Sequence, residues 1–289
     1  MFNARIIILN YNGENLLPQC LPSLIKAHQK ANLIAPVTVL DNLSTDASEK
    51  LLRDDYPNIS FVKATENLVL CSYNYYLTQV KESIVILLNN DIRVDEDFIP
   101  PLLAKFRENP QTFLVAPRVM NFDGSRVDAA RTKAKLRFGI FWSSGRYPGH
   151  EREMMIPSET FSSGFGAFSR EKFLQLGGYD KRFLPGIMED ADLCLRAQRT
   201  GFHLYYEPRS VVYHMGQASF KKVFGHDKLQ VLAHRNNFLF MWKNFSGLAF
   251  WGPHFFFLPL HFSFAILKGN WALVVGFFQA LVHSRGNPK

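Results

Sequence analysis

Polar side chains that can bind a ligand follow each of four predicted strands in the first third of this 289-residue chain. The clusters are Asn10-Tyr11-Asn12, Asp41-Asn42, Glu66-Asn67 and Asn89-Asn90-Asp91. Each cluster taken singly is typical of a turn or a helix N-cap, where Asn and Asp are common. Polar ends of several strands in one sheet converge on one edge, however, and α/β sheets bind ligands at that edge. Together the clusters predict a polar binding crevice.

A second group of ionisable residues opens the helix predicted from Asp190 to about Thr200. Asp190 shares one face of this helix with apolar residues that should dock on the core, which leaves Asp190 at the edge of the cleft. The apolar residues on this face are Leu193, Cys194 and Ala197. A helix N-terminus favours an ionised carboxylate. From the pattern alone a simple helix cap is favoured, with Asp192 complementing the helix dipole and Glu189 facing solvent.

An alternation of strands and helices between residues 4 and 119 must position the crevice. β-Branched runs predict strands at Arg5–Leu9, Val37–Leu40, Ile59–Val62, Ile84–Leu88 and Phe113–Ala116. Amphipathic patterns predict helices at Asn15–Ala27, Asp46–Tyr56, Cys71–Gln79 and Asp95–Glu108. Such alternation needs crossover connections, so we expect an α/β fold with a mostly parallel sheet covered by helices on both faces.

The pattern changes after residue 120. Residues 121–158 are rich in Gly and Arg, and we expect a long connection that carries a short hairpin and borders the cleft. The later strands are expected at Phe161–Phe168, His203–Tyr206 and Val211–Tyr213. The later helices, besides the one from Asp190, are expected at Glu171–Leu176 and His226–Lys243.

Charge and aromatic residues are distributed unevenly. Residues 1–208 contain 24 basic and 24 acidic side chains, whereas residues 209–289 contain nine basic and one acidic. Thirteen of the 27 Phe residues lie between Phe220 and Phe278. With 47% hydrophobic and 20% charged residues, a disordered, collagen-like or disulfide-rich chain is excluded. We expect a neutral globular portion joined to a basic, aromatic tail.

The cysteines and the first residues bear on the cellular compartment. Cys20, Cys71 and Cys194 are widely spaced and form no C-x-x-C pair, so neither a disulfide framework nor a zinc site is indicated. The N-terminus enters the apolar run 6–9 without the features of a signal peptide. We therefore expect the active portion to stay on the cytoplasmic side.

Six short segments, in one order along residues 4–240, carry a resemblance to a known family. The segments are Leu9–Glu14, Leu40–Asp46, Leu87–Asp91, Gly177–Asp180, Met188–Arg196 and Val211–His214. They resemble the inverting glycosyltransferases of family 2, which have the GT-A fold, and most of all its rhamnosyltransferase-like members. The resemblance implies transfer of a sugar from a nucleotide-diphosphate donor to a hydroxyl of a glycolipid or lipid-linked saccharide in cell-surface polysaccharide synthesis.

The resemblance also implies a divalent cation, Mg²⁺ or Mn²⁺, which stabilises charge on the leaving diphosphate. Asp91 matches the last residue of the family's metal-binding triplet, and His214 matches a histidine near the metal. Asn89 and Asn90 replace other acids of a fuller motif, so the protein's own hold on the ion should be weak. By residue type alone, a single His after a strand is also explained as a turn residue.

Donor contacts follow from the same resemblance. The donor-binding residues that it implies are Asn10, Tyr11, Asp41, Asn67, Asn90 and Asp91. Asp41 would accept a hydrogen bond from a pyrimidine N–H and Tyr11 would pack beside the base, although Asp41 also suits a turn cap. Relatives commonly have a Gly-rich Asn-x-Gly-x-x-x-Ala-x-Asn pattern where this chain has residues 66–74, and here Val69, Leu70 and Cys71 make the loop bulkier.

Inversion requires one general base that takes the proton of the acceptor hydroxyl. The resemblance assigns this role to Asp190, and it places Glu189 and Gly164 on the acceptor side. Gly164 and Gly166 would allow the backbone to approach the sugar closely, although a β-bulge explains both glycines almost as well.

The basic tail suggests a membrane surface. Leu248–Leu267 carries no charge over 20 residues but contains two prolines, and Ala272–Val282 is too short to span a bilayer. We expect an interfacial or re-entrant helical pair at the cytoplasmic face of the cell membrane. Anionic lipid would lie near Lys243, Lys268, Arg285 and Lys289. A buried hairpin at a dimer interface is the alternative, and the sequence does not indicate the oligomeric state.

The expected organisation is a GT-A domain over residues 1–243 and a helical tail over residues 244–289. Within the domain, residues 1–119 form the nucleotide-sugar half and residues 120–243 the acceptor and catalytic half. A sugar-phosphate nucleotidyltransferase is an alternative, but it needs no Asp190-type base or membrane tail. A nucleic-acid-binding protein is suggested by the pI of 9.4, but the positive charge accompanies Phe clusters rather than a polar basic face, so we expect no nucleic-acid partner.

Overall fold

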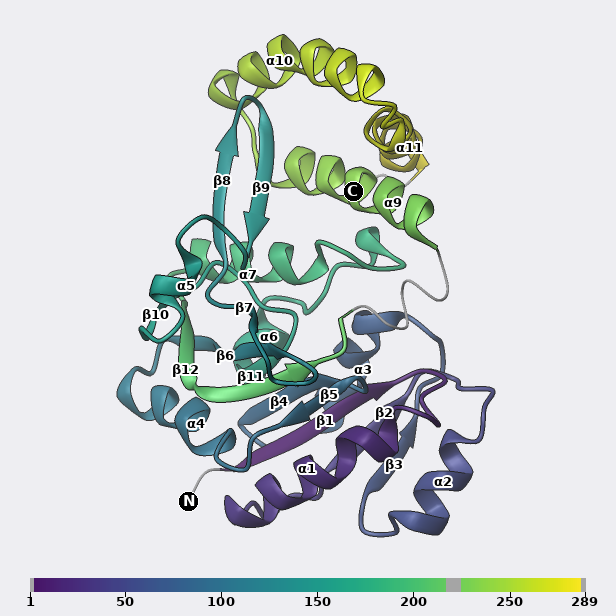
Figure 1. Ribbon diagram of the computed structural model, residues 1–289, viewed down its shortest axis with the longest axis vertical. Coiled ribbons are helices and arrows are strands. Elements are labelled where there is room, and N and C mark those ends of the chain that lie inside the picture. The colour runs from purple at the N-terminus through teal and green to yellow at the C-terminus, as the bar shows by residue number, and fades with distance from the viewer. Residues whose placement is uncertain (1–2, 217–224, 287–289) are drawn as a thin grey trace.

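The computed structural model describes residues 3–216 and 225–286, and a central ten-stranded sheet crosses it (Figure 1). The sheet has the order β10-β12-β6-β11-β4-β1-β2-β3, with β5 paired to β12 and β7 paired to β6. Its strands are β1 (Ala4–Asn10), β2 (Thr38–Asp41), β3 (Ser60–Lys63), β4 (Ile84–Asn89), β5 (Ile92–Val94), β6 (Thr112–Asn121), β7 (Val127–Ala129), β10 (Ser158–Glu159), β11 (Gly166–Ser169) and β12 (His203–His214). The pairs β1–β2, β2–β3, β1–β4 and β6–β12 are parallel, which confirms the expected mostly parallel α/β sheet.

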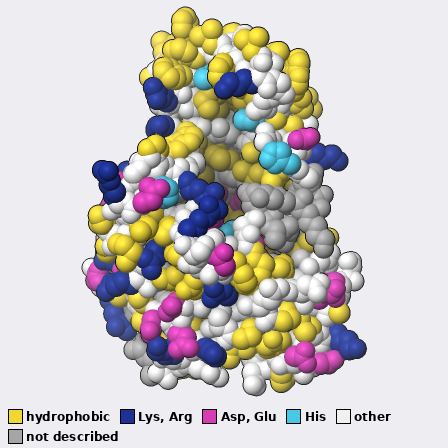
Figure 2. All heavy atoms as spheres, viewed as in Figure 1, with side chains coloured by type: hydrophobic (Ala, Val, Ile, Leu, Met, Phe, Trp, Pro, Cys, Tyr) yellow, Lys and Arg dark blue, Asp and Glu magenta, His cyan; other side chains and the backbone are white. Residues whose placement is uncertain are grey.

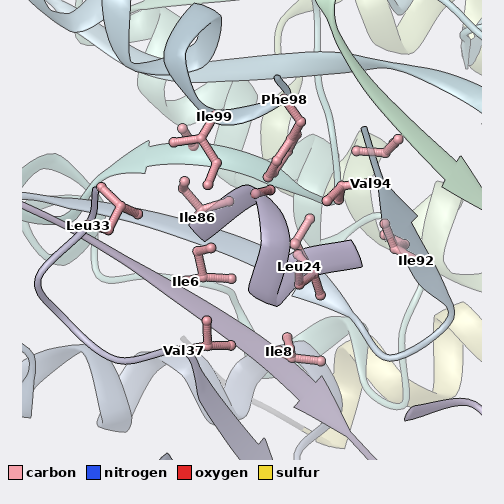
Figure 3. Packing of buried hydrophobic residues seen from close by; sticks show 14 of the residues in the cluster. Ile6, Ile8, Leu24, Leu33, Val37, Ile86, Ile92, Val94, Phe98 and Ile99 are labelled. Carbon is pink, nitrogen blue, oxygen red and sulfur yellow. The ribbon is translucent and has the colours of Figure 1, made fainter. Parts of the chain in front are cut away.

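Helices cover both faces of the sheet because successive strand residues point to opposite sides. Ile6 and Ile8 lie in one apolar core with α1 (Leu17–Lys30), α2 (Ser48–Asp55) and α4 (Ile99–Glu108), part of which Figure 3 shows. Ile7 and Leu9 lie in the core of the other face. That core is completed by α3 (Ser72–Gln79), α6 (Arg170–Gln175) and α7 (Glu189–Arg199). The alternating apolar strands thus fix a three-layer arrangement.

A third core joins the second half of the chain to the C-terminal helices. It contains residues of α9 (His226–Asn244), α10 (Leu248–Leu267) and α11 (Ala272–Gly286). The hairpin of β8 (Lys133–Arg137) and β9 (Ile140–Ser144) reaches up to α10, as Figure 1 shows. The hairpin expected in residues 121–158 is therefore present, together with the short helix α5 (His150–Glu153).

Two expected elements in the second half differ from the structure. The strand predicted at Phe161–Phe168 is limited to β11, because Phe161 N–H donates to Thr132 O, outside the main sheet. The two runs predicted at 203–206 and 211–213 form one strand, β12, whose register with β6 shifts between Glu207 and Val211. The strand continues because Ser210 Oγ donates to Phe98 O and holds the irregular segment against α4. The three cysteines are free and buried.

Candidate active site

The carboxyl ends of β1, β2 and β4 bring Asn10, Asp41 and Asn90 into direct contact. Asn10 Nδ2 donates to Asp41 Oδ1 at 2.9 Å, and Asn90 Nδ2 donates to Asn10 Oδ1 at 2.8 Å. Ser44 closes the turn after β2, because its backbone N–H donates to Asp41 Oδ2 at 2.9 Å. All three strand-end side chains are buried. The predicted polar crevice therefore rests on one connected hydrogen-bond chain, and part of the bonding of Asp41 is that of a turn cap.

Gly13 makes this hydrogen-bond chain possible. A Cβ at position 13 would lie 2.1 Å from Asn10 Oδ1 and 2.5 Å from Asn90 Nδ2. Both distances are far below van der Waals contact, so even alanine would displace the two amides. The glycine after Asn10-Tyr11-Asn12 is thus part of the polar edge.

Tyr11 and Asn67 lie at the exposed rim of the same edge. The Tyr11 side chain is 38% exposed, which leaves its ring available to a ligand. Asn67 is also exposed, and its Oδ1 accepts a hydrogen bond from the N–H of Val69 at 3.2 Å. Asn42 Nδ2 donates to Val69 O at 3.2 Å, which attaches the loop to the end of β2. Val69 opens the 3-10 helix η1 (Val69–Cys71) with a left-handed φ of 50°.

We expect Val69→Gly to raise the free energy of unfolding. A left-handed φ at a β-branched residue costs about 1–3 kcal/mol, and glycine removes this strain but loses about 0.5–1 kcal/mol through its greater freedom in the unfolded chain. The expected net gain is about 1 kcal/mol in chemical denaturation. Leu68→Gly is the matched control, since Leu68 has a φ of −107° and should only be destabilised. Equal losses in both variants would contradict the strain argument.

Asp91 and His214 lie together at the ends of β4 and β12. His214 Nε2 is 3.4 Å from Asp91 Oδ2, and Met215 N–H donates to Asp91 O at 3.2 Å. Asp91 Oδ1 is buried and has no hydrogen-bond partner among the described residues. One unpartnered carboxylate oxygen beside an imidazole nitrogen suits a divalent cation that takes its other ligands from a diphosphate. Across residues 3–216 and 225–286 there is no cluster of three or more His, Cys, Asp or Glu that could hold a metal ion.

Asp190 is the second residue of α7, and the structure corrects two of the pattern-based alternatives. The N-cap of α7 is Met188, which makes no side-chain cap, so Asp190 does not cap the helix. Glu189 is only 6% exposed, and its Oε2 has no partner in the described part of the chain, so Glu189 does not face solvent. A Cβ on Gly164 would lie 3.7 Å from Asp190 Oδ2. The structure thus brings together the three residues predicted on the acceptor side.

Burial governs the protonation of this carboxylate pair. It raises the pKa of Asp190. Burial, and then the neighbouring charge of Asp190, raise the pKa of Glu189 to about 8. A buried carboxylate beside a second negative charge is unfavourable in its ionised form, so near neutral pH Glu189 holds a proton. A carboxylate with a raised pKa is a stronger proton acceptor, which suits Asp190 to base catalysis.

The acceptor side and the metal side are joined through two consecutive residues. Gly164 faces Asp190, and the ring of the next residue, Phe165, lies 5.6 Å from the ring of His214 between centroids. Because consecutive Cα atoms are about 3.8 Å apart, the candidate base and the candidate metal ligand lie on either side of this short segment.

Asp192 and Lys243 form an ion pair that the sequence did not predict. The position of Lys243 contradicts the expectation that it lies near anionic lipid. Lys243 Nζ lies 2.8 Å from Asp192 Oδ2 and 2.6 Å from Asp180 Oδ2. Asp192 is fully buried and also accepts from Arg196 and Asn244. Lys243 is therefore not a lipid-contacting residue, because both acidic partners hold it inside the molecule. Burial alone would raise the pKa of Asp180, but the Lys243 hydrogen bond and charge lower it overall.

A cavity of about 550 Å³ opens between the end of β6, β7 and α5. Its charged lining residues are Arg118, Arg126, Asp128, Arg146, His150 and Glu151. Met120, another lining residue, pairs with Tyr213, the residue before His214. The cavity therefore lies one strand from the candidate metal ligand. The sequence indicated only that this region is Gly- and Arg-rich and borders the cleft.

Solved structures with similar folds define the class. A GalNAc-T7 crystal structure with UDP, GalNAc and Mn²⁺ superimposes with a TM-score of 0.62 at 18% identity and covers 84% of this chain and 49% of that one. A mannosyltransferase from Pyrobaculum calidifontis, in complex with GDP-Man and Mn²⁺, gives a TM-score of 0.58 at 16% identity and covers 99% of this chain and 76% of that one. The fold is that of the GT-A glycosyltransferases.

Residues 5–177 match the model of the family described as glycosyl transferase family 2. This match spans more than half of the sequence, and the chain belongs to that family. The N-acetylglucosaminyl-diphospho-decaprenol L-rhamnosyltransferase of Mycobacterium tuberculosis is 27% identical over 270 residues, covering 84% of this chain and 85% of that protein. The predicted family and its rhamnosyltransferase-like character are thereby confirmed.

Proposed function

We propose that this enzyme transfers a hexosyl or rhamnosyl group, with inversion and with a divalent cation, to a hydroxyl of a lipid-linked saccharide. The proposed setting is cell-surface polysaccharide synthesis at the cytoplasmic face of the membrane. The observation that carries the proposal is a set of contacts that places Asp41 against Asn10, Asp91 beside His214, and Asp190 beside Gly164, whose neighbour Phe165 packs on His214. The relative from M. tuberculosis, named for rhamnosyl transfer to a diphospho-decaprenol lipid, supports the donor and acceptor classes.

Donor binding is assigned to the β1–β2–β4 edge. Asp41 is fixed by Asn10, so its carboxylate can accept from a pyrimidine N–H without reorganising. Asn90 supports this arrangement through Asn10, while Tyr11 and Asn67 lie at the rim. Mg²⁺ or Mn²⁺ would be held by Asp91 and His214, and would supply charge stabilisation to the leaving diphosphate. These two residues alone would make few bonds to an ion, so the diphosphate would have to supply further ligands.

Asp190 is assigned the proton transfer. The acceptor hydroxyl gives its proton to the Asp190 carboxylate as its oxygen attacks the anomeric carbon and the bond to the diphosphate breaks. Glu189, which holds a proton near neutral pH, adds no second negative charge beside the attacking oxygen. Gly164 leaves room for the acceptor sugar beside Asp190.

The arginine-lined cavity supports an acceptor that carries phosphate. Arg146 pairs with Asp128, but Arg118 and Arg126 form no ion pair in the described part of the chain. Two guanidinium groups without an ion pair favour a diphosphate, which they would bind with charge-assisted hydrogen bonds.

The C-terminal helices support membrane contact. Among the described residues, one helix is long and apolar enough to cross a membrane, and it is Leu248–Leu267. Figure 2 shows hydrophobic side chains gathered over α10 and α11 at one end of the molecule. Phe138 at the tip of the β8–β9 hairpin packs on Phe257 of α10 and is itself half exposed. A Cβ at Gly139 would lie 2.4 Å from His254 Cα, so this glycine permits the contact.

We infer that this end of the molecule lies in the membrane interface. The exposed apolar residues of α10 include Phe255, Phe256, Leu260, Phe264 and Leu267. Lys268 follows them, and the hairpin contributes exposed Lys135 and Arg137, which suits anionic lipid. Lys228 is a further exposed basic residue, at the start of α9. The other basic residues of this region lie outside the described residues, and these are Lys221, Lys222, Lys289 and the side chain of Arg285.

We expect the double variant Phe256→Asp with Phe264→Asp to lose flotation on anionic liposomes by at least tenfold. Each buried Phe contributes about 1.5–3 kcal/mol to apolar burial, and a carboxylate adds repulsion. Ile34→Asp is the matched control, because Ile34 is 84% exposed at the opposite part of the fold. Unchanged flotation of the double variant would exclude this surface as the anchor, and a change from dimer to monomer would favour the dimer interface instead.

The function is tested by a panel of nucleotide-sugar donors with and without Mn²⁺, using two acceptors. One acceptor is a saccharide on a lipid diphosphate and the other is the same saccharide on a neutral lipid. The proposal predicts metal-dependent transfer, an inverted anomeric centre in the product and preference for the diphosphate acceptor. A retained anomeric configuration would contradict the mechanism, and equal use of both acceptors would contradict the role of the cavity.

A further inference from the structure

Asn236 of α9 holds the loop that leads into the catalytic helix. Its side chain is fully buried, and Nδ2 lies at hydrogen-bond distance from three carbonyl oxygens. These belong to Phe183 at 2.6 Å, Gly186 at 2.7 Å and Ile187 at 2.9 Å. Asn236 Oδ1 accepts from Arg235 Nε at 2.9 Å, which fixes the orientation of the amide. An amide NH₂ with three acceptors is a polar clamp on this loop.

The loop that Asn236 clamps needs external support. Ile187 and Met188 have left-handed φ angles of 74° and 80°, although neither is glycine. Such backbone persists only where the surroundings impose it. Met188 is the N-cap of α7 and provides no side-chain cap, so no side chain at the N-cap position holds this helix start. Asp190 follows two residues later, and its position therefore depends on the loop.

Two further residues on the same face of α9 bind α7, at a position after Asp190 in the chain. Lys243 and Asn244 lie seven and eight residues after Asn236, which places them two helical turns further along the same face. Both bind the buried Asp192, at 2.8 Å and 2.9 Å. The catalytic helix is therefore attached to α9 on both sides of Asp190.

The C-terminal helices pack on another face of α9. Phe238 packs edge to face on Phe277 of α11, with 5.2 Å between ring centroids, and Trp242 Nε1 donates to His254 Nε2 of α10. Figure 1 shows α9 between α7 and the pair α10 and α11. One helix thus supports the catalytic loop on one side and carries the proposed membrane contact on the other.

We propose that Asn236 is a positioning residue for Asp190, and that α9 is the rigid support through which the C-terminal helices hold the catalytic loop in place. This inference rests on the proposed role of Asp190 as the base. The amide acts through geometry alone, because it touches the carbonyls before α7 and no reacting atom. Misplacing a catalytic group by about 1 Å can reduce turnover about a hundredfold.

The test is a double-mutant cycle on kcat with Asn236→Ala and Asp190→Asn, assayed in the full-length protein. We expect Asn236→Ala to lower kcat about 10- to 100-fold while the KM for the donor stays unchanged. If Asn236 acts only through Asp190, the double variant is no slower than Asp190→Asn alone. Independent, multiplicative losses would overturn the positioning role.

Asn237→Ala is the matched control, since Asn237 is the next residue of α9 and its Nδ2 donates to Phe141 O at 3.0 Å in the hairpin. It should lose comparable thermal stability without the loss of kcat. If Asn236→Ala fails to fold, Asn236→Ser provides one donor of smaller size, and the same cycle applies. Full turnover by Asp190→Asn would refute the proposed role of Asp190 as the base, whereas an inactive Asp190→Asn beside a fully active, folded Asn236→Ala would refute only the positioning role.

Discussion

Asp190→Asn is expected to reduce sugar transfer about 10²- to 10⁴-fold while donor binding and the fold persist, because the amide cannot take the proton of the acceptor hydroxyl. The wild-type rate should fall as the pH drops through the raised pKa of Asp190, since the protonated carboxyl cannot act as a base. In the variant this acidic limb should disappear. Single-turnover transfer, measured over a pH series beside donor affinity, checks both parts.

Glu189→Gln identifies which of the two adjacent carboxyl groups is the base. Burial and the charge of Asp190 raise the pKa of Glu189 to about 8, so replacing a protonated Glu with neutral Gln changes little charge at neutral pH. Its loss of transfer should be smaller than that of Asp190→Asn. The opposite ranking would move the base to Glu189, and near-normal turnover of Asp190→Asn would remove that residue from the mechanism.

Asp91→Ala is expected to abolish the metal-dependent part of nucleoside diphosphate binding and to slow transfer about 10²- to 10³-fold. Lewis-acid stabilisation of a leaving diphosphate contributes several kcal/mol, and each 1.4 kcal/mol is about tenfold. The unpartnered Oδ1 of Asp91 is the protein oxygen best placed for the ion, and His214 adds one nitrogen. Calorimetry of diphosphate binding with and without Mn²⁺ measures the effect.

Asp91→Asn is the conservative comparison, because it retains a carbonyl oxygen but loses the charge. It should bind the metal–diphosphate complex more weakly than the wild type and more strongly than Asp91→Ala. If metal changes the diphosphate affinity equally in all three proteins, Asp91 is only a turn residue at the end of β4.

Local sequence was sufficient for most elements of the first half, although it did not predict β5 and began the helix α4 at Asp95 rather than Ile99. The runs around Ile6–Ile8 and Ile84–Leu88 are apolar at successive positions, and successive positions of a strand face opposite sides of the sheet. This pattern indicates a strand that is buried on both faces, as these two strands are. The polar strand ends were also readable, since Asn10, Asp41 and Asn90 follow strands that lie side by side in the sheet. Parallel topology then places them together at one edge.

Long-range contacts decided the second half. The sequence could not limit the strand at 161–168 to β11, because the hydrogen bond that takes Phe161 out of the main sheet goes to Thr132, which is distant in the chain. From its position on the helix, the sequence predicted that Glu189 faces solvent. From its charge, the sequence predicted that Lys243 lies near lipid. Their burial depends on elements more than 50 residues apart in the chain, such as the 51 residues that separate Asp192 from Lys243.

The sequence by itself determined the parallel sheet and the polar edge, because these depend on residue periodicity and on residue type at strand ends, and its resemblance to a family named the candidate reactive groups. The tertiary structure alone decided how those groups are charged and held. Burial sets the protonation of Glu189 beside Asp190, and α9 supplies the hydrogen bonds for a loop whose own residues, Ile187 and Met188, do not favour its backbone. Desolvation and support from a distant helix are properties of packing, and no local pattern records them.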